Sequence, residues 1–132
     1  MDRREKELPE QDCLFLDRLG KRWEVINDGS TWVLIHDFTL PDGYTESTVT
    51  LAIRIESGYP LTALDMMYVH PVLQRKDGKK INAVDCMQPL DQKQFQRWSR
   101  HRTGGNPWIS GQDSLETHFY LVEDFFSSEL LK

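Results

Sequence analysis

The stretch YPLTALDMMYVHPVLQRKDGKKINAVDC occupies residues 59–86, and the rest of the chain is organised around it. It opens with a Tyr-Pro dipeptide, passes through His70-Pro71 and ends at Cys86, one of only two cysteines in the chain. Two further irregular segments follow it, QRWSRHR at 96–102 and NPWISGQD at 106–113. Irregular segments held on a rigid scaffold carry a large share of binding and catalytic residues. We therefore expect function to lie in residues 59–113 and the preceding residues to form the scaffold.

Composition narrows the class of protein. A chain of 132 residues with 39% hydrophobic and 28% charged residues predicts one globular domain over 1–132, with 1–7 frayed. The net charge of −5 argues against nucleic acid or a membrane surface as a partner. No apolar run reaches the roughly 18 residues of a membrane span, and the charged first residues do not resemble a secretory signal. Two cysteines make no disulfide framework and indicate free thiols, so we expect a cytoplasmic protein.

The residues up to position 70 predict a helix followed by a four-strand antiparallel meander. The helix is expected to begin near Pro9 and to end at Gly20. Strands are expected at 22–27, 31–38, 48–56 and 64–69. The third of these has apolar residues at every second position from Val49 to Ile55, which predicts a strand with one buried face.

The second half of the chain predicts a long loop region containing a short helix, and then a final helix. The short helix is expected at 92–102, where Phe95 and Trp98 are three residues apart. The final helix should begin after Asp113 or Ser114 as its N-cap. Its apolar face, with spacings of four, three and four, consists of Leu115, Phe119, Val122 and Phe126. The predicted fold class is therefore α+β, with the last helix packed across the meander.

This order of features resembles the ubiquitin-conjugating enzyme superfamily, whose members have the UBC fold. In that superfamily a Tyr-Pro dipeptide follows the third strand, a His-Pro motif follows the fourth, and a catalytic cysteine, a tryptophan and a crossing helix come next. Tyr59-Pro60, His70-Pro71, Cys86 and Trp108 stand at the corresponding places here. The pairing of Trp-Ser-Arg-His-Arg with Trp-x-x-Gly-x-Asp, which ends at Asp113, resembles a divergent bacterial branch.

The resemblance implies a protein that accepts a ubiquitin-like modifier from an activating enzyme as a thioester on Cys86 and passes it on. The implied partners are the modifier, an activating-enzyme-like protein and a deubiquitinase-like protease, with no cofactor and no metal. The thiolate is the nucleophile in such a reaction and must be accessible. Lys79, Lys80 or the arginines near Trp98 could stabilise it. A buried or incidental thiol is the alternative for Cys86.

Two departures from the superfamily leave a second function open. Val72 stands where the motif has asparagine, and Cys86 lies sixteen residues after His70, further than in the eukaryotic enzymes. The asparagine would donate to the oxyanion of the tetrahedral intermediate; Asn82, Asn106 or backbone amides could replace it. The second function is a catalytically inactive adaptor that binds the modifier or the activating enzyme.

The remaining candidate residues each have a functional and a structural interpretation. His101 is a candidate for acyl or oxyanion support, and Arg100 and Arg102 could recognise an anion such as the modifier's carboxyl terminus. Ordinary salt bridges on a solvated helix face are the alternative for the arginines. Trp98 and Trp108 are candidate binding residues and otherwise anchors of the core or loops.

We expect His70 to tie its loop by hydrogen bonds and Asp113 to cap the last helix rather than act as a base. No histidine pair has the spacing of metal ligands.

Overall fold

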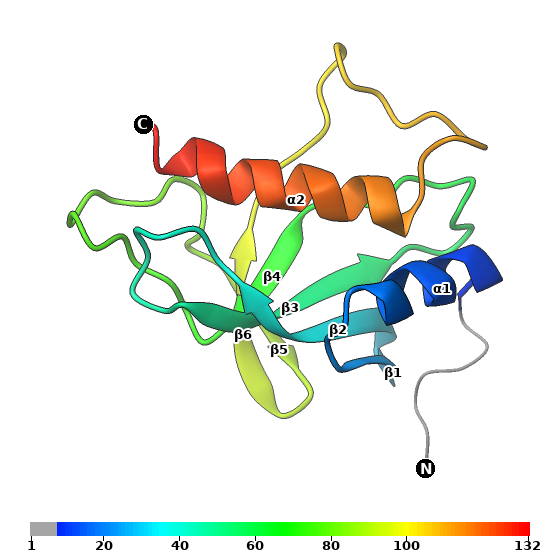
Figure 1. Ribbon diagram of the computed structural model, residues 1–132, viewed down its shortest axis with the longest axis horizontal. Helices are drawn as coiled ribbons and strands as arrows, with labels where there is room; N and C mark the ends of the chain where they lie inside the picture. The colour runs from blue at the N-terminus through cyan, green and yellow to red at the C-terminus, as the bar shows by residue number, and fades with distance from the viewer. Residues whose placement is uncertain (1–7) are drawn as a thin grey trace.

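The computed structural model describes residues 8–132 and shows an α+β fold, with two helices packed against an antiparallel sheet (Figure 1). The predicted fraying of residues 1–7 lies outside the described part. The helices are α1 (Glu10–Arg18) and α2 (Leu115–Glu129). The strands are β1 (Trp23–Asp28), β2 (Ser30–Thr39), β3 (Thr48–Ile55), β4 (Met67–His70), β5 (Met87–Leu90) and β6 (Lys93–Trp98). No helix in the described part is long and apolar enough to cross a membrane.

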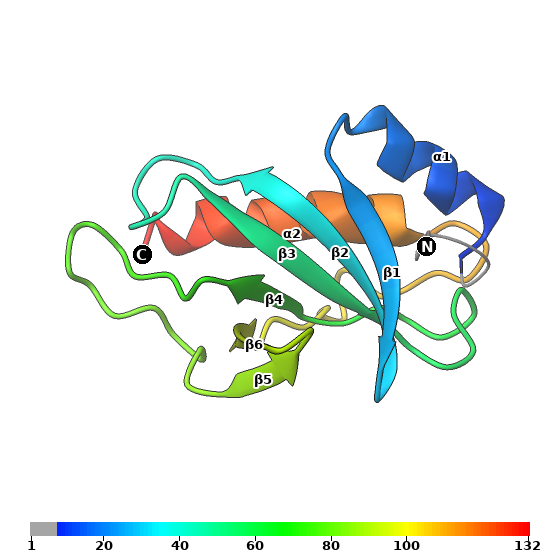
Figure 2. The same ribbon diagram turned by 90° about the horizontal axis from the view of Figure 1, so that it is seen from below.

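The six strands form one sheet in the order β1-β2-β3-β4-β6-β5. The predicted four-strand meander is present as β1 to β4, whose neighbours all pair antiparallel. Asp28-Gly29 makes the first turn, with Gly29 at a φ of 76°, a backbone conformation that glycine adopts at little steric cost. Helix α2 runs across one face of the sheet, and α1 lies beside β1 at one end (Figures 1 and 2).

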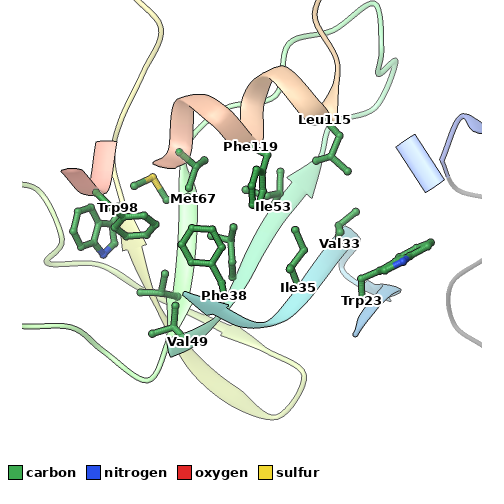
Figure 3. Packing of buried hydrophobic residues seen from close by; sticks show 14 of the residues in the cluster. Trp23, Val33, Ile35, Phe38, Val49, Ile53, Met67, Trp98, Leu115 and Phe119 are labelled. Atoms are coloured by element: carbon green, nitrogen blue, oxygen red, sulfur yellow. The ribbon is translucent and has the colours of Figure 1, made fainter. Parts of the chain in front are cut away.

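The main core fills the space between the sheet and α2, as Figure 3 shows. The apolar face predicted for the last helix is confirmed, because its four residues are buried. From the sheet, β3 contributes the alternating residues that were predicted to face inward, Val49, Leu51, Ile53 and Ile55. Burial of this apolar surface on one face of the sheet is the main force that holds α2 in place.

A second, smaller cluster lies on the opposite face of the sheet. It contains Trp32 and Tyr68, whose rings meet edge to face at 4.9 Å, together with Leu90 and Phe95 from the β5–β6 hairpin. The hairpin lies on the side of the sheet away from α2 (Figure 1). At its tip, the Asp91 amide donates to Asp28 Oδ2 over 2.8 Å. The sheet is therefore curled, because its last hairpin returns to its first turn.

The predicted short helix at 92–102 is wrong, because residues 93–98 form strand β6. Phe95 and Trp98 do not share a helical face: Phe95 belongs to the smaller cluster and Trp98 to the main core. A spacing of three fits a helix face, but it also fits a strand that is buried on both faces. The fourth strand is also shorter than predicted and begins at Met67, after Met66 at a φ of 61°.

A junction at one end of the sheet joins both helices to the Tyr59-Pro60 turn. The Tyr59 hydroxyl donates to Asp12 Oδ2 over 2.6 Å and accepts from the Leu115 amide over 2.7 Å. The Trp108 indole donates to the Pro60 carbonyl over 3.1 Å. These bonds hold the start of α2, and the irregular segment before it, against α1 and the turn.

Candidate functional site

Cys86 lies on the surface immediately before β5, one of the two edge strands of the sheet. Its carbonyl oxygen accepts a hydrogen bond from the Arg97 amide of β6 over 3.0 Å, which fixes the backbone at this position. The other cysteine, Cys13, is partly buried in α1 and packs against the main core. Cys86 is therefore the more accessible of the two thiols.

A cavity of about 480 Å³ opens beside the segment that leads to Cys86. It lies between the residues that follow His70-Pro71 and the turn before Cys86. Its lining includes Val72, Lys79, Lys80, Val84 and Asp85. Cys86 follows Asp85 directly but is not one of the lining residues. The cavity thus offers space and positive charge near the thiol, while the thiol itself lies outside it.

His70 connects the end of β4 to β6. Its Nδ1 lies 3.0 Å from the Gln94 carbonyl oxygen, and its ring lies 5.5 Å from that of Phe95. The imidazole therefore forms a hydrogen bond with the backbone of the neighbouring strand and packs against one of its aromatic rings. After the His-Pro pair, Val72 is 46% exposed and lines the cavity.

The two asparagines that could replace the missing donor differ in their contacts. The Asn106 side-chain oxygen accepts from Arg102 Nη1 over 3.4 Å, so this amide is engaged with the irregular segment before α2. Asn82 lies in an exposed turn, and its side chain makes no hydrogen bond to any other residue of the described chain. Within residues 8–132, no hydrogen bond joins either asparagine to the side chain of Cys86.

Arg100 lies under the C-terminal end of α2 and is largely buried. Its Nη2 donates to Glu129 Oε1 over 3.0 Å, and its guanidinium lies 4.9 Å from the centre of the Trp98 ring. Glu129 is only 2% exposed and also lies 3.9 Å from Arg75. Arg100 is thus one of three cations, with Arg75 and Lys132, that neutralise a buried carboxylate, and Trp98 is part of the core.

Arg102 occupies a similar position at the other end of α2. Its Nη1 lies 3.8 Å from Asp113 Oδ2, and its guanidinium stacks 5.1 Å from the Trp108 ring centre. Partial burial acts to raise the Asp113 pKa, but hydrogen bonds from Ile109 and Thr117 and the Arg102 charge lower it overall. The Asp113 carboxylate accepts a hydrogen bond from the Ile109 amide over 2.7 Å.

The N-cap of α2 is Ser114, one of the two residues predicted for this position. The Ser114 amide donates to the Thr117 hydroxyl over 3.0 Å, which satisfies one donor at the helix start. Asp113 therefore does not cap the helix itself, and its carboxylate instead closes the loop that leads into it.

His101 forms a pair with Asp65 that the sequence did not reveal. Its Nδ1 lies 3.0 Å from both carboxylate oxygens, and its side chain is 61% exposed. Both residues line a cavity of about 470 Å³ that also includes Thr62 and Arg54. The only available signal was that Asp65 is the single acidic residue between Tyr59-Pro60 and His70.

The structure does not bring His101 to Cys86. Strand β6 pairs with β4 on one side and with β5 on the other. Asp65 lies just before β4, whereas Cys86 lies just before β5, so the two candidate groups are on opposite sides of β6. Within residues 8–132 no hydrogen bond or ion pair joins them, and no three His, Cys, Asp or Glu side chains converge as metal ligands would.

The comparisons with known proteins give one match. The model of a family described as prokaryotic E2 family E matches residues 8–129, which include both helices, all six strands and Cys86. Searches of curated proteins and of solved structures give no significant match. Since the family match spans almost the entire chain, this protein belongs to prokaryotic E2 family E, a divergent bacterial branch of the ubiquitin-conjugating-like proteins.

Proposed function

We propose that this protein receives a ubiquitin-like modifier from an activating enzyme, carries it as a thioester on Cys86 and passes it on. Membership of the family supports a ubiquitin-conjugating-like role in general. The observation that carries the finer proposal is the exposure of Cys86 at the start of an edge strand, whereas Cys13 packs against the core. A protein-sized acyl donor can approach only a thiol that lies on the surface.

The surroundings of Cys86 agree with this chemistry. In the proposed reaction the thiolate attacks the acyl carbon of the incoming thioester, and the thiol of the activating enzyme leaves. The neighbouring cavity of about 480 Å³ provides room for the terminal residues of the modifier. Lys79 and Lys80 line it and could donate hydrogen bonds to the carbonyl oxygens of that segment. The implied partners are the modifier, the activating enzyme and a deubiquitinase-like protease, in a reducing compartment such as the cytoplasm.

The first test needs no partner. The folded protein is treated at pH 7 with a limiting amount of iodoacetamide, and alkylation of Cys86 and Cys13 is measured separately by peptide mass spectrometry. We expect Cys86 to react at least tenfold faster than Cys13. If Cys86 stays unmodified until urea unfolds the chain, the thioester proposal fails, and the inactive adaptor becomes the better account.

The second test uses the cells that encode the protein. A tagged copy is recovered under acidic, non-reducing conditions and analysed on gels with and without added thiol. We expect a higher-mass adduct that thiol removes, that Cys86→Ala abolishes and that the matched control Cys13→Ala retains. An adaptor would give no thiol-sensitive adduct, and Cys86→Ala would leave its partner binding intact.

A further inference from the structure

Arg97 differs from every other arginine in the described part of the chain. Residues 8–132 contain seven arginines, and six of them form an ion pair with a carboxylate. These six are Arg18, Arg22, Arg54, Arg75, Arg100 and Arg102. The Arg97 guanidinium has no such partner within residues 8–132, although the side chain is half-buried. Its Nε is buried and has no hydrogen-bond acceptor.

The strand register places this unpaired cation beside Cys86. In the β5–β6 hairpin, Met87 is opposite Gln96, and the hydrogen bond from the Arg97 amide to the Cys86 carbonyl extends this pairing by one residue. Residues that are directly opposite in an antiparallel pair have side chains on the same face, with Cβ atoms about 4.5–5.5 Å apart. The Cys86 and Arg97 side chains therefore project from the same face of the hairpin.

The other neighbours of Arg97 hold it in position without neutralising it. Tyr68 of β4 is opposite Arg97 on the other side of β6, and its phenol interacts electrostatically with the guanidinium. Tyr68 is 2% exposed and packed against Trp32, so this side of the site is rigid. A buried N–H group without an acceptor is unfavourable. Arg102 Nε is also buried without an acceptor, but Arg102 is paired with Asp113. Arg97 instead combines an unpaired guanidinium with a position opposite the exposed Cys86, so an acceptor on an acyl group at this thiol would give it a partner.

We propose that the Arg97 guanidinium donates a hydrogen bond to the carbonyl oxygen of the acyl group that Cys86 receives. The inference rests on the proposed thioester function. The Cys86 thiolate forms a bond to the acyl carbon, and the carbonyl π electrons move to oxygen as an oxyanion. When the carbonyl re-forms, the bond to the donor thiol breaks and that thiol leaves as a thiolate. Arg97 stabilises the oxyanion between these two events.

This assignment explains how the reaction could proceed with Val72 in place of asparagine. An oxyanion donor must be held where negative charge develops, and removal of one typically slows acyl transfer by roughly 100- to 1,000-fold. A guanidinium remains charged at any physiological pH and offers several N–H groups in a fixed plane. Arg100 and Arg102, the arginines that the sequence singled out, are already paired with Glu129 and Asp113.

The test compares two small reagents that react with the same thiol. S-phenyl thioacetate acetylates Cys86 through a tetrahedral oxyanion and releases thiophenol, whereas iodoacetamide alkylates it by displacement and forms no oxyanion. Rates at Cys86 are measured by peptide mass spectrometry in wild type, Arg97→Met and Arg97→Lys. We expect Arg97→Met to slow acetylation at least tenfold while alkylation changes less than twofold. Arg97→Lys should restore part of the acetylation rate.

The control and the contrary outcomes separate the hypotheses. Arg54→Met removes another arginine from the same sheet face, one that is paired with Glu56, and it should leave the ratio of the two rates unchanged. If Arg97→Met slows both reactions equally, or does not slow acetylation, the proposed role of Arg97 fails, while the proposed thioester function is unaffected. Wild-type Cys86 that is inert to both reagents would instead overturn the proposed thioester function. Circular dichroism and thermal unfolding of each variant establish that it is folded.

Discussion

His118 is a buried histidine whose environment favours the neutral ring. It lies on α2 and is 1% exposed; its Nε2 donates to the Met66 carbonyl over 2.9 Å, and its Nδ1 is buried without a partner. Burial, together with the nearby Arg102 charge, lowers the His118 pKa below its usual value, and the bond to Met66 only partly opposes this. Protonation of this ring therefore works against the packing of α2 on the sheet.

The first prediction concerns the acid stability of the protein. The unfolded chain takes up a proton on His118 near pH 6.5, whereas the folded protein does so only at lower pH. The free energy of unfolding should therefore fall as pH decreases below about 6.5. His118→Gln removes this titration. When the pH is lowered from 7.5 to 5, the thermal unfolding midpoint of the variant should therefore fall less than that of wild type. Both proteins share Asp12, whose buried carboxyl has a raised pKa, so the difference between their slopes isolates His118. Identical slopes would contradict the prediction.

At the scale of single residues, the sequence singled out Cys86 as a candidate thiol, but it did not indicate which residues surround it. Cys86 and His70 stand out because their residue types are rare and their order in the chain matches a family. Arg97 and Asp65 do not, because an arginine or an aspartate is common and its neighbours are decided by strand pairing. The unpaired state of Arg97 depends on where the carboxylates of the folded chain lie, and a linear sequence does not contain this information.

At the scale of elements, α1 and α2 are joined through one tyrosine. The Tyr59 hydroxyl bridges the carboxylate of Asp12 and the first amide of α2 at Leu115. Burial, together with the hydrogen bond and charge of Asp12, raises the Tyr59 pKa, so the hydroxyl stays protonated and remains a donor. The Tyr-Pro turn therefore serves here as a connector between the two helices.

The second prediction tests this connector. Tyr59→Phe keeps the ring but leaves the buried Asp12 carboxyl and the Leu115 amide without their partner. We expect the free energy of unfolding in urea to fall by about 1–3 kcal/mol. Tyr120→Phe is a matched control, because the Tyr120 hydroxyl bonds to Glu116 on an exposed surface and its loss should change stability by less than about 0.5 kcal/mol. Equal effects of the two substitutions would show that the bridge contributes no more than a surface bond.

The β5–β6 hairpin is the element that the sequence pattern did not predict. Its turn residues, Asp91 and Gln92, have φ angles of 52° and 62°. Two-residue hairpin turns with positive φ are usually recognised by Asn-Gly or Asp-Gly, and neither pair is present here. By contrast, β3 and α2 were predictable, because each has one buried face and a single clear period.

At the scale of the whole molecule, a contact between residues far apart in the sequence connects the two ends of the curled sheet. The bond from Asp91 to Asp28 spans 63 residues and joins the tips of two hairpins. The β5–β6 hairpin contributes Leu90 and Phe95 to the cluster around Trp32 and Tyr68, and Tyr68 is opposite Arg97 in the sheet. Local periodicity cannot predict such a contact, because it follows from the twist and curl of the complete sheet.

The last prediction concerns this contact. Asp28→Ala removes the charged acceptor of the Asp91 amide at an exposed position and also changes the Asp-Gly turn, so the free energy of unfolding should fall by about 0.5–1.5 kcal/mol. Hydrogen exchange should become faster in β5 and β6, because the hairpin then opens more often than the rest of the sheet. Exchange in β2 and β3 should change only through the global loss of stability. Asp28→Asn keeps both a side-chain acceptor and the Asx-Gly turn pair, so it should exchange like wild type. If Asp28→Ala instead leaves the hairpin amides as protected as in wild type, the apolar cluster alone keeps the sheet curled and holds Arg97 beside Cys86.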